Sequence, residues 1–159
     1  MAVADAALRL GLARDELDAE VGRAAGRTGA GPARRAAAFA DGRAESPGES
    51  FSRVVIHELG LPEPDLQVRV CRASGTLVGR CDFGWEELRT LGEFDGKVKY
   101  GRLLREGQEA GDVVFEEKVR EDELRGLGHE VVRWVDADLR EPTHLRTRLQ
   151  RAFARGRSR

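Results

Sequence analysis

LVGRCDFGWEELRTLGEFDGK, residues 77–97, is the stretch that decides the fold. Two short β-strands are predicted within it, because apolar and β-branched residues alternate with polar ones on either side of a turn-like segment. Three acidic residues lie near the ends of these strands. They are Asp82 on the first strand and Glu93 and Asp95 on the second. The stretch therefore predicts a sheet that gathers carboxylates at one edge.

The second strand places several of these side chains on one face. Residues two apart on a strand share a face, so Glu93, Asp95 and Lys97 are expected to point the same way, while Leu91 and Phe94 pack around them. Clustered carboxylates repel one another unless a cation neutralises them, and hard divalent cations prefer oxygen ligands. The pattern therefore predicts a Mg²⁺ or Mn²⁺ site.

At these residues the sequence resembles the PD-(D/E)xK restriction-endonuclease-like superfamily, and more narrowly domains similar to very-short-patch-repair endonucleases. The resemblance lies in Arg80–Phe83, in Glu93-Phe94-Asp95-Gly96 and in the downstream run from Glu117 to Trp134. It covers roughly Glu45 to Phe153. It implies a restriction-endonuclease-like fold and metal-dependent hydrolysis of phosphodiester bonds in DNA.

The resemblance also implies roles for four residues. Asp82 and Glu93 would be metal ligands, Asp95 would lie beside them, and Lys97 would stabilise charge on the phosphate. The superfamily's usual lysine, counted from Glu93, is replaced here by Asp95, whereas Asp95-Gly96-Lys97 restores the D-x-K spacing one step later.

Further candidates lie outside the acidic stretch. Glu49, on a predicted first helix, is either a partner of the helix dipole or the acidic metal ligand that many nucleases of this superfamily take from that helix. Arg120 either balances the carboxylates or holds the scissile phosphate. Lys99 and Tyr100 are candidate contacts to the nucleic-acid backbone.

Outward from the acidic stretch, the remaining elements complete an α/β domain. Ser46 is a predicted N-cap with Pro47 in the first turn, and Gly60-Leu61-Pro62 ends that helix. The elements that follow it are predicted as strands Leu66–Cys71, Leu77–Phe83 and Arg89–Asp95, helix Val113–Leu127, strand Glu130–Val135 and helix Pro142–Ala154. This α-β-β-β-α-β order is the restriction-endonuclease-like core, a mixed sheet flanked by helices.

Residues 1–44 are expected to form an N-terminal helical extension, and residues 45–159 the domain that resembles an endonuclease. The extension is rich in alanine and predicts helices over Ala4–Leu10, Ala13–Ala25 and Pro32–Ala40. Its opening, with Glu45–Ser50, resembles segments of actinobacterial proteins that join an AbiEi antitoxin-like winged helix to this nuclease-like domain. The extension is therefore expected either to pack against the nuclease-like domain or, as this resemblance implies, to be the remnant of a longer protein.

Composition limits the cellular setting. No apolar run approaches the roughly 20 residues of a membrane helix, and the N-terminus has no apolar signal region, so a cytoplasmic protein without a membrane partner is expected. The net charge is −1, yet residues 140–159 hold seven arginines against one acid. This tail either binds phosphates or is a solvated helix end.

The two cysteines are expected to be reduced thiols. A hairpin centred on Ser74-Gly75 would place Cys71 opposite Val78 and Cys81 opposite Val68, which separates the sulfur atoms. With three scattered histidines, no zinc spacing emerges.

Three functions follow as alternatives. The first is a metal-dependent endonuclease. The second is a catalytically inactive nuclease-fold module that binds nucleic acid or a protein, and the third is a truncated product without a role of its own. The choice between DNA and RNA, the sequence preference and the oligomeric state stay open.

Overall fold

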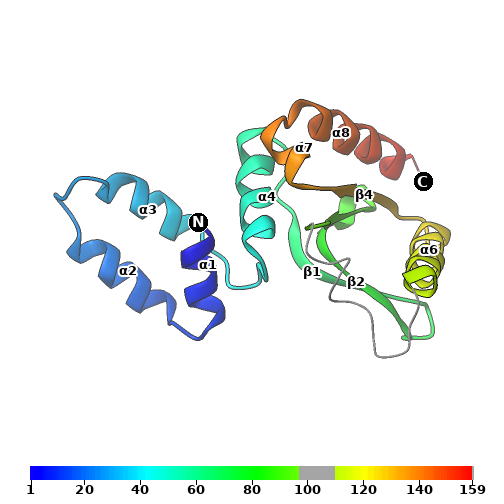
Figure 1. Cartoon of the computed structure of the whole chain (residues 1–159), viewed down its shortest axis with the longest axis horizontal. Helices are drawn as coiled ribbons and strands as arrows, with labels where there is room; N and C mark the ends of the chain where they lie inside the picture. The colour runs from blue at the N-terminus through cyan, green and yellow to red at the C-terminus, as the bar shows by residue number, and fades with distance from the viewer. Residues whose placement is uncertain (97–109, 159) are drawn as a thin grey trace. The chain divides into compact units, whose positions relative to one another are not determined.

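The computed structural model describes residues 1–96 and 110–158 of the chain. Contacts group the chain into two compact units, Met1–Val54 and Val55–Arg159 (Figure 1). The boundary between the units falls inside helix α4 (Pro47–Glu58), whereas the sequence predicted it before Glu45.

The N-terminal unit contains the three predicted helices. They are α1 (Ala2–Arg9), α2 (Arg14–Arg23) and α3 (Ala30–Phe39). Asp5 of α1 is fully buried, accepts a hydrogen bond from the Asp41 amide (2.9 Å) and pairs with Arg53 Nη1 (3.3 Å). Loss of either partner would leave the charge of the other buried and unpaired. This contact therefore fixes how the helices of the unit meet.

The C-terminal unit is built on a four-stranded mixed sheet of order β1-β2-β3-β4. The first three strands pair antiparallel and β4 pairs parallel to β3, with helix α6 (Ala110–Gly126) between them in the chain. The strands are β1 (Asp65–Cys71), β2 (Leu77–Trp85), β3 (Thr90–Phe94) and β4 (Glu130–Trp134). The predicted α-β-β-β-α-β order is thus confirmed, as is the mixed, helix-flanked sheet.

Three short or terminal elements complete the unit. They are the 3₁₀ turn η1 (Glu86–Leu88), helix α7 (Asp136–Arg140) and helix α8 (Thr143–Arg157). Sequence analysis predicted α8 but neither η1 nor α7, which are too short to show a hydrophobic period.

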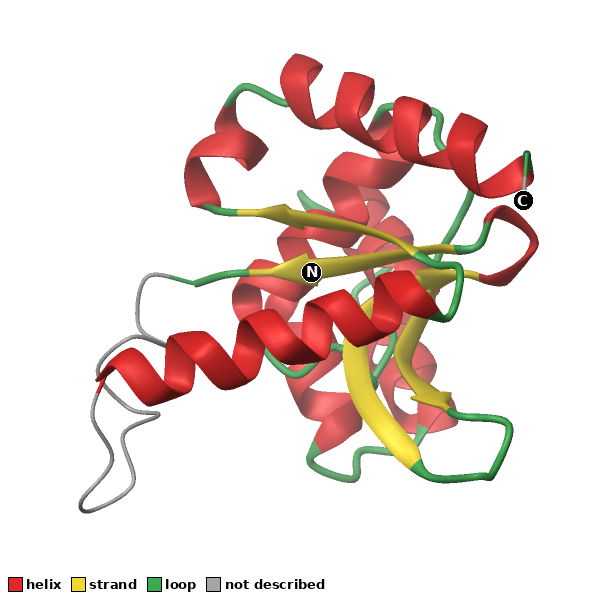
Figure 2. Cartoon of the chain, turned by 90° about the vertical axis from the view of Figure 1, so that its right-hand side faces the viewer, coloured by secondary structure: helices red, strands yellow, loops and turns green. Residues whose placement is uncertain are grey.

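The two faces of the sheet are covered by different helices. Val131 of β4 packs with Leu124 of α6, whereas Val132 and Trp134 pack with residues of α8 such as Leu149. Figure 2 shows α8 on one side of β3 and β4 and α6 on the other. Side chains alternate between the two faces along a strand, so Arg133, two residues after Val131, is directed to the α6 face.

The β1–β2 ladder changes face at one point. Leu66 pairs with Phe83 in the core under α8, whereas the pair formed by Val68 and Cys81 belongs to the core under α6. Gln67 lies between them with φ of 56°, a left-handed conformation that is uncommon outside glycine. The residue opposite this irregularity is Asp82.

Both tryptophans are packing residues. Trp85 is 4% exposed and Trp134 is 1% exposed, with its ring centroid 5.1 Å from that of Phe83. A Cβ added to Gly92 would lie 2.6 Å from Trp134, so the indole packs directly on the β3 backbone. This contact leaves no room for base stacking on Trp134.

One predicted register is right and its neighbour is wrong. Val68 pairs with Cys81 as expected, but Cys71 pairs with Leu77 and not with Val78. An irregularity between Val70 and Cys71 shifts the register there, because a bulge adds one residue to one strand. Both cysteines are free thiols, as expected.

Within residues 1–96 and 110–158, none of the helices combines the length and the apolar character that a membrane span requires.

Candidate functional site

Glu93 is at the centre of the candidate site. It lies on β3, two residues after Leu91, which packs under α6, so the Glu93 side chain is directed to the same face. The parallel ladder places Glu93 beside Arg133 of β4. The residue is only 6% exposed. A carboxylate this deep in a sheet requires partners.

Each oxygen of Glu93 is paired with a different arginine. Arg120 Nη2, on α6, lies 2.5 Å from Oε1, and Arg133 Nη2 lies 2.8 Å from Oε2. The side chains of Arg120 and Arg133 are 22% and 27% exposed, whereas that of Glu93 is 8% exposed. The guanidinium groups therefore lie between the carboxylate and solvent.

Arg120 depends on a glycine of β2. A Cβ added to Gly79 would lie 2.9 Å from Arg120 Nη1 and 3.2 Å from its Cδ, so the arginine passes directly over the strand. Arg120 Nη1 also lies 4.0 Å from the sulfur of Cys81. Gly79 thus makes room for the reach from α6 to Glu93.

Two acids of α6 extend the cluster. Arg120 donates to both oxygens of Glu117 (2.6 and 2.9 Å), and Arg133 pairs with Glu117 and, through Nε, with Glu121 at 3.0 Å. Burial raises the pKa of Glu117, but hydrogen bonds from Arg120 and Arg133 outweigh burial and hold that pKa below its usual value. Glu117 and Glu93 raise the pKa of Arg120. Burial lowers the pKa of Arg133, but Glu117, Glu93 and Asp95 outweigh burial and raise it.

Asp82 lies across the β2–β3 ladder from Glu93. Phe83 pairs with Gly92, so the antiparallel register sets position 82 opposite position 93. Asp82 Oδ2 accepts a hydrogen bond from the Phe94 amide at 2.9 Å. Asp82 is half-buried. The two predicted metal ligands are therefore brought to adjacent strands at one point of the sheet.

The other predicted residues have different placements. Asp95 is half-buried, and its Oδ2 lies 3.6 Å from Arg133 Nη1. Glu49 belongs to the N-terminal unit, where its oxygens accept hydrogen bonds from the Glu45 amide and the Ser46 hydroxyl (both 2.8 Å) and help to cap α4. A metal-binding role for Glu49 stays a prediction. Lys97, Lys99 and Tyr100 lie outside the described residues.

The sequence pattern predicted no individual role for Arg133, Glu117 or Glu121. All three lie within the downstream run that carried the resemblance. One signal could have found Arg133. It lies two residues after Val131, on the same buried face of a short apolar strand, and an arginine at such a position requires an acidic partner.

The cluster gathers carboxylates and guanidinium groups from the sheet and from helix α6. In the described part of the chain its carboxylates are Asp82, Glu93, Asp95, Glu117 and Glu121, and its guanidinium groups are Arg120, Arg125 and Arg133. Within the same residues, however, no three His, Cys, Asp or Glu side chains are arranged to hold a metal.

The donor set of Asp82 and Glu93 fits Mg²⁺ in its chemistry. This ion is commonly bound by one or two carboxylates and completes its coordination with water and substrate phosphate. Both residues supply hard oxygen atoms from adjacent strands. A third protein carboxylate is therefore not required, and the arginines on Glu93 are the groups that such an ion would have to displace.

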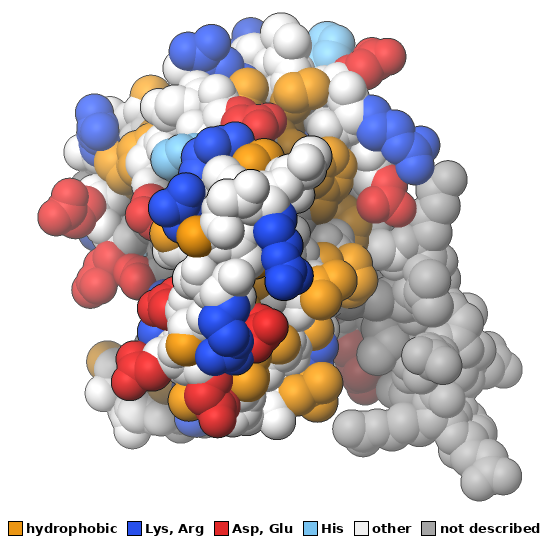
Figure 3. All heavy atoms as spheres, turned by 90° about the vertical axis from the view of Figure 1, so that its left-hand side faces the viewer, with side chains coloured by type: hydrophobic (Ala, Val, Ile, Leu, Met, Phe, Trp, Pro, Cys, Tyr) orange, Lys and Arg blue, Asp and Glu red, His pale blue; other side chains and the backbone are white. Residues whose placement is uncertain are grey.

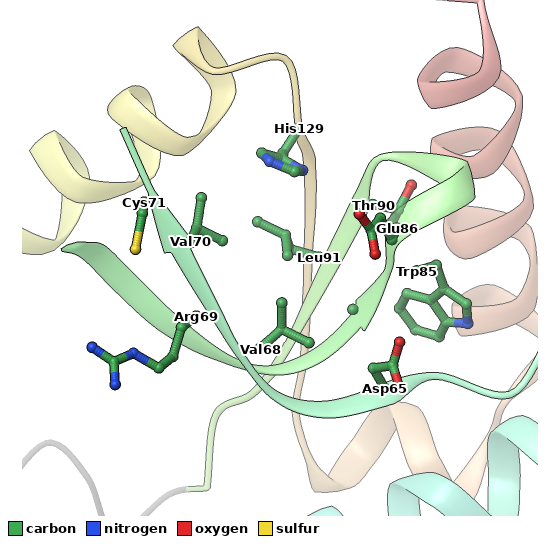
Figure 4. Close-up of a pocket in the computed structure, with 11 residues that line it drawn as sticks. Asp65, Val68, Arg69, Val70, Cys71, Trp85, Glu86, Thr90, Leu91 and His129 are labelled. Atoms are coloured by element: carbon green, nitrogen blue, oxygen red, sulfur yellow. The ribbon is translucent and has the colours of Figure 1, made fainter. Parts of the chain in front are cut away.

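A cavity lined by both apolar and polar side chains lies on the same sheet face (Figure 4). Its volume is about 270 Å³, and Val68, Val70 and Leu91 form its floor. Burial, with a smaller contribution from the charge of Arg89, lowers the pKa of His129 at its edge, which favours the neutral imidazole. Because Leu91 and Glu93 share one face of β3, the surface that carries the acidic cluster continues into this cavity.

The two cysteines are expected to differ in reactivity. Cys81 is fully buried, and burial together with the charge of Glu93 raises its pKa to about 12, whereas Cys71 is exposed. Only the thiolate is nucleophilic. Iodoacetamide at neutral pH should therefore modify Cys71 and spare Cys81 in the native protein, as mass spectrometry of tryptic peptides would show. Alkylation of Cys81 at the rate of Cys71 would contradict this burial, and denaturant should expose both.

Comparison with known proteins finds two relatives in Mycobacterium tuberculosis. The chain is 36% identical over 159 residues to "Uncharacterized protein MT2308" of strain CDC 1551 / Oshkosh and, equally, to "Uncharacterized protein Rv2248" of strain ATCC 25618 / H37Rv. The match covers 99% of this chain and 55% of each relative, so the chain spans about half of their length. No family model matches the chain. No solved structure matches it either.

Proposed function

We propose that this protein is a metal-dependent endonuclease that hydrolyses phosphodiester bonds in DNA. The observation that carries the proposal is the placement of Glu93 and Asp82. The two carboxylates lie on adjacent strands at one point of the sheet, with two arginines on Glu93. The resemblance of residues 80–83, 93–96 and 117–134 to PD-(D/E)xK nucleases supports the same reaction.

Each group has a distinct part in the proposed reaction. A Mg²⁺ or Mn²⁺ ion held by Asp82 and Glu93 would lower the pKa of bound water and polarise the phosphate. Arg120 and Arg133 present planar forks of N–H donors, which match the oxygen atoms of a phosphate. Their positive charges stabilise the charge that develops on those oxygen atoms. The buried strands keep the carboxylates in fixed positions.

A second candidate is a module that binds without cutting. It is favoured by the complete pairing of Glu93 with Arg120 and Arg133, which is also the pattern of a structural ion-pair network. In that case the acids only balance the arginines. On the face drawn in Figure 3, positive, negative and hydrophobic side chains are intermingled, so that face shows no broad single-sign surface for nucleic acid.

Cleavage of supercoiled plasmid by the purified protein decides between these candidates. The endonuclease should convert plasmid to nicked or linear DNA with Mg²⁺ or Mn²⁺, and EDTA should stop the reaction. Asp82→Asn removes the charge but keeps the size, and it should lower the rate at least about 100-fold, the scale on which one preorganised charge acts in catalysis. If the protein binds DNA but does not cut it with any metal, the result would favour the binding module.

A further inference from the structure

We infer that DNA phosphate and the divalent cation enter the site together, because Arg120 and Arg133 exchange Glu93 for the phosphate as the cation takes their place. This inference rests on the proposed function and specifies that Arg120 and Arg133 move from Glu93 to the phosphate when the cation binds.

The free protein already holds positive charge where the cation would bind. Guanidinium nitrogens lie 2.5 and 2.8 Å from the two oxygens of Glu93. A dication placed on this carboxylate would meet two like charges at short range. The cation is therefore expected to bind the free protein weakly.

A phosphate group reaches the arginines before it reaches Glu93. The arginine side chains are 22% and 27% exposed, and the Glu93 side chain is 8% exposed. Guanidinium forks bind phosphate oxygens in a bidentate manner. A phosphodiester that approaches from solvent thus meets Arg120 and Arg133 first and draws their charge away from the carboxylate.

The arginines can leave Glu93 without losing every partner. Arg120 keeps Glu117, and Arg133 keeps Glu117 and Glu121, all on α6. A buried arginine left with no anion would be costly, and these acids remove that penalty. Glu117 and Glu121 therefore remain ion-pair partners of the arginines during the exchange.

Thermodynamic linkage turns the exchange into a measurable coupling. If phosphate binding tightens cation binding by some factor, the cation tightens phosphate binding by the same factor. Such couplings usually amount to roughly 5- to 150-fold. Removing the charge of Arg133 should therefore tighten cation binding by part of this factor even when no DNA is present.

The experiment measures Mn²⁺ binding by electron paramagnetic resonance of the free ion. Wild-type protein is titrated alone and with a phosphorothioate-linked duplex, which resists hydrolysis, and ion bound by the duplex alone is subtracted. The duplex should tighten Mn²⁺ binding to the wild type by at least about fivefold. Arg133→Gln should bind Mn²⁺ at least about fivefold more tightly than wild type in the absence of DNA, and the duplex should add little.

Two variants separate this effect from a general loss of structure. Gly79→Ala alters no charge but crowds Arg120, so it should shift Mn²⁺ affinity of the free protein in the same direction as Arg133→Gln. Arg155→Gln removes an ion-pair partner of another buried acid, Glu130, away from the cluster. It should leave Mn²⁺ affinity at the wild-type value.

The possible failures can be told apart. If wild type alone binds Mn²⁺ as tightly as Arg133→Gln, and the duplex changes neither, the exchange is wrong even if metal-dependent cleavage is observed. If no form binds Mn²⁺ with or without the duplex and plasmid is never cut, the proposed function fails, and this inference fails with it.

Discussion

Glu93→Gln is expected to abolish metal-dependent DNA cleavage, with a loss of at least about 100-fold, because the amide keeps the shape of the side chain but removes its charge. Without that charge, position 93 no longer attracts a cation or holds Arg120 and Arg133 in place. The measurement is the initial rate of plasmid nicking with Mg²⁺ in excess.

The matched control for this variant is Glu130→Gln. Glu130 is 4% exposed and pairs with Arg155 (2.8 Å), so both substitutions remove a buried carboxylate from an ion pair. Each should cost about 2 kcal/mol of unfolding free energy, the usual size of a hydrogen bond to a charged group. Only Glu93→Gln should lose cleavage. Equal activity in the two variants would show that Glu93 is a structural acid and would remove it from the proposed site.

Gly156→Ala is expected to destabilise the C-terminal unit by about 3 kcal/mol, at the upper end of the usual cost of overpacking. Gly156 is on α8 where the helix meets η1, and an added Cβ would lie 1.8 Å from the carbonyl oxygen of Leu88. That oxygen also accepts a hydrogen bond from the Thr90 hydroxyl (2.8 Å), so it is not free to move aside. The helix would have to lift away from its core contacts.

Urea unfolding followed by circular dichroism measures this cost. Gly126→Ala is the control, because Gly126 ends α6 and an added Cβ there meets no atom within 4 Å. It should leave stability unchanged or raise it by up to about 1 kcal/mol, since alanine favours helix more than glycine does. A Gly156→Ala protein as stable as wild type would mean that α8 does not pack on η1 as described.

The local pattern of the sequence was sufficient for the elements of the sheet. Apolar alternation predicted the four strands, and Ser46 and Pro47 predicted where α4 begins. Short elements were missed because three to five residues show no period, and η1 and α7 fall in that class. The register at Cys71 was missed because a bulge depends on packing between strands.

The candidate site was predicted only in part. The order of Asp82, Glu93 and Asp95 along the strands indicated that they would meet, and the β2–β3 register sets Asp82 opposite Glu93. Arg120 was predicted from the sequence as a residue that could balance the acids, whereas Arg133 was not. The pairing of Glu93 with Arg133 joins two adjacent parallel strands, β3 and β4, which α6 separates along the chain. No local spacing in the sequence therefore encodes it.

By itself, the sequence determined which segments become strands and helices and which acids lie at the strand ends, because those features depend on neighbours along the chain. Only the tertiary structure decided that both oxygens of Glu93 are held by arginines and that Gly79 and Gly156 are points of close approach. These contacts arise from the packing of α6 and α8 on opposite faces of the sheet. They depend on distances across the fold that the order of residues does not specify.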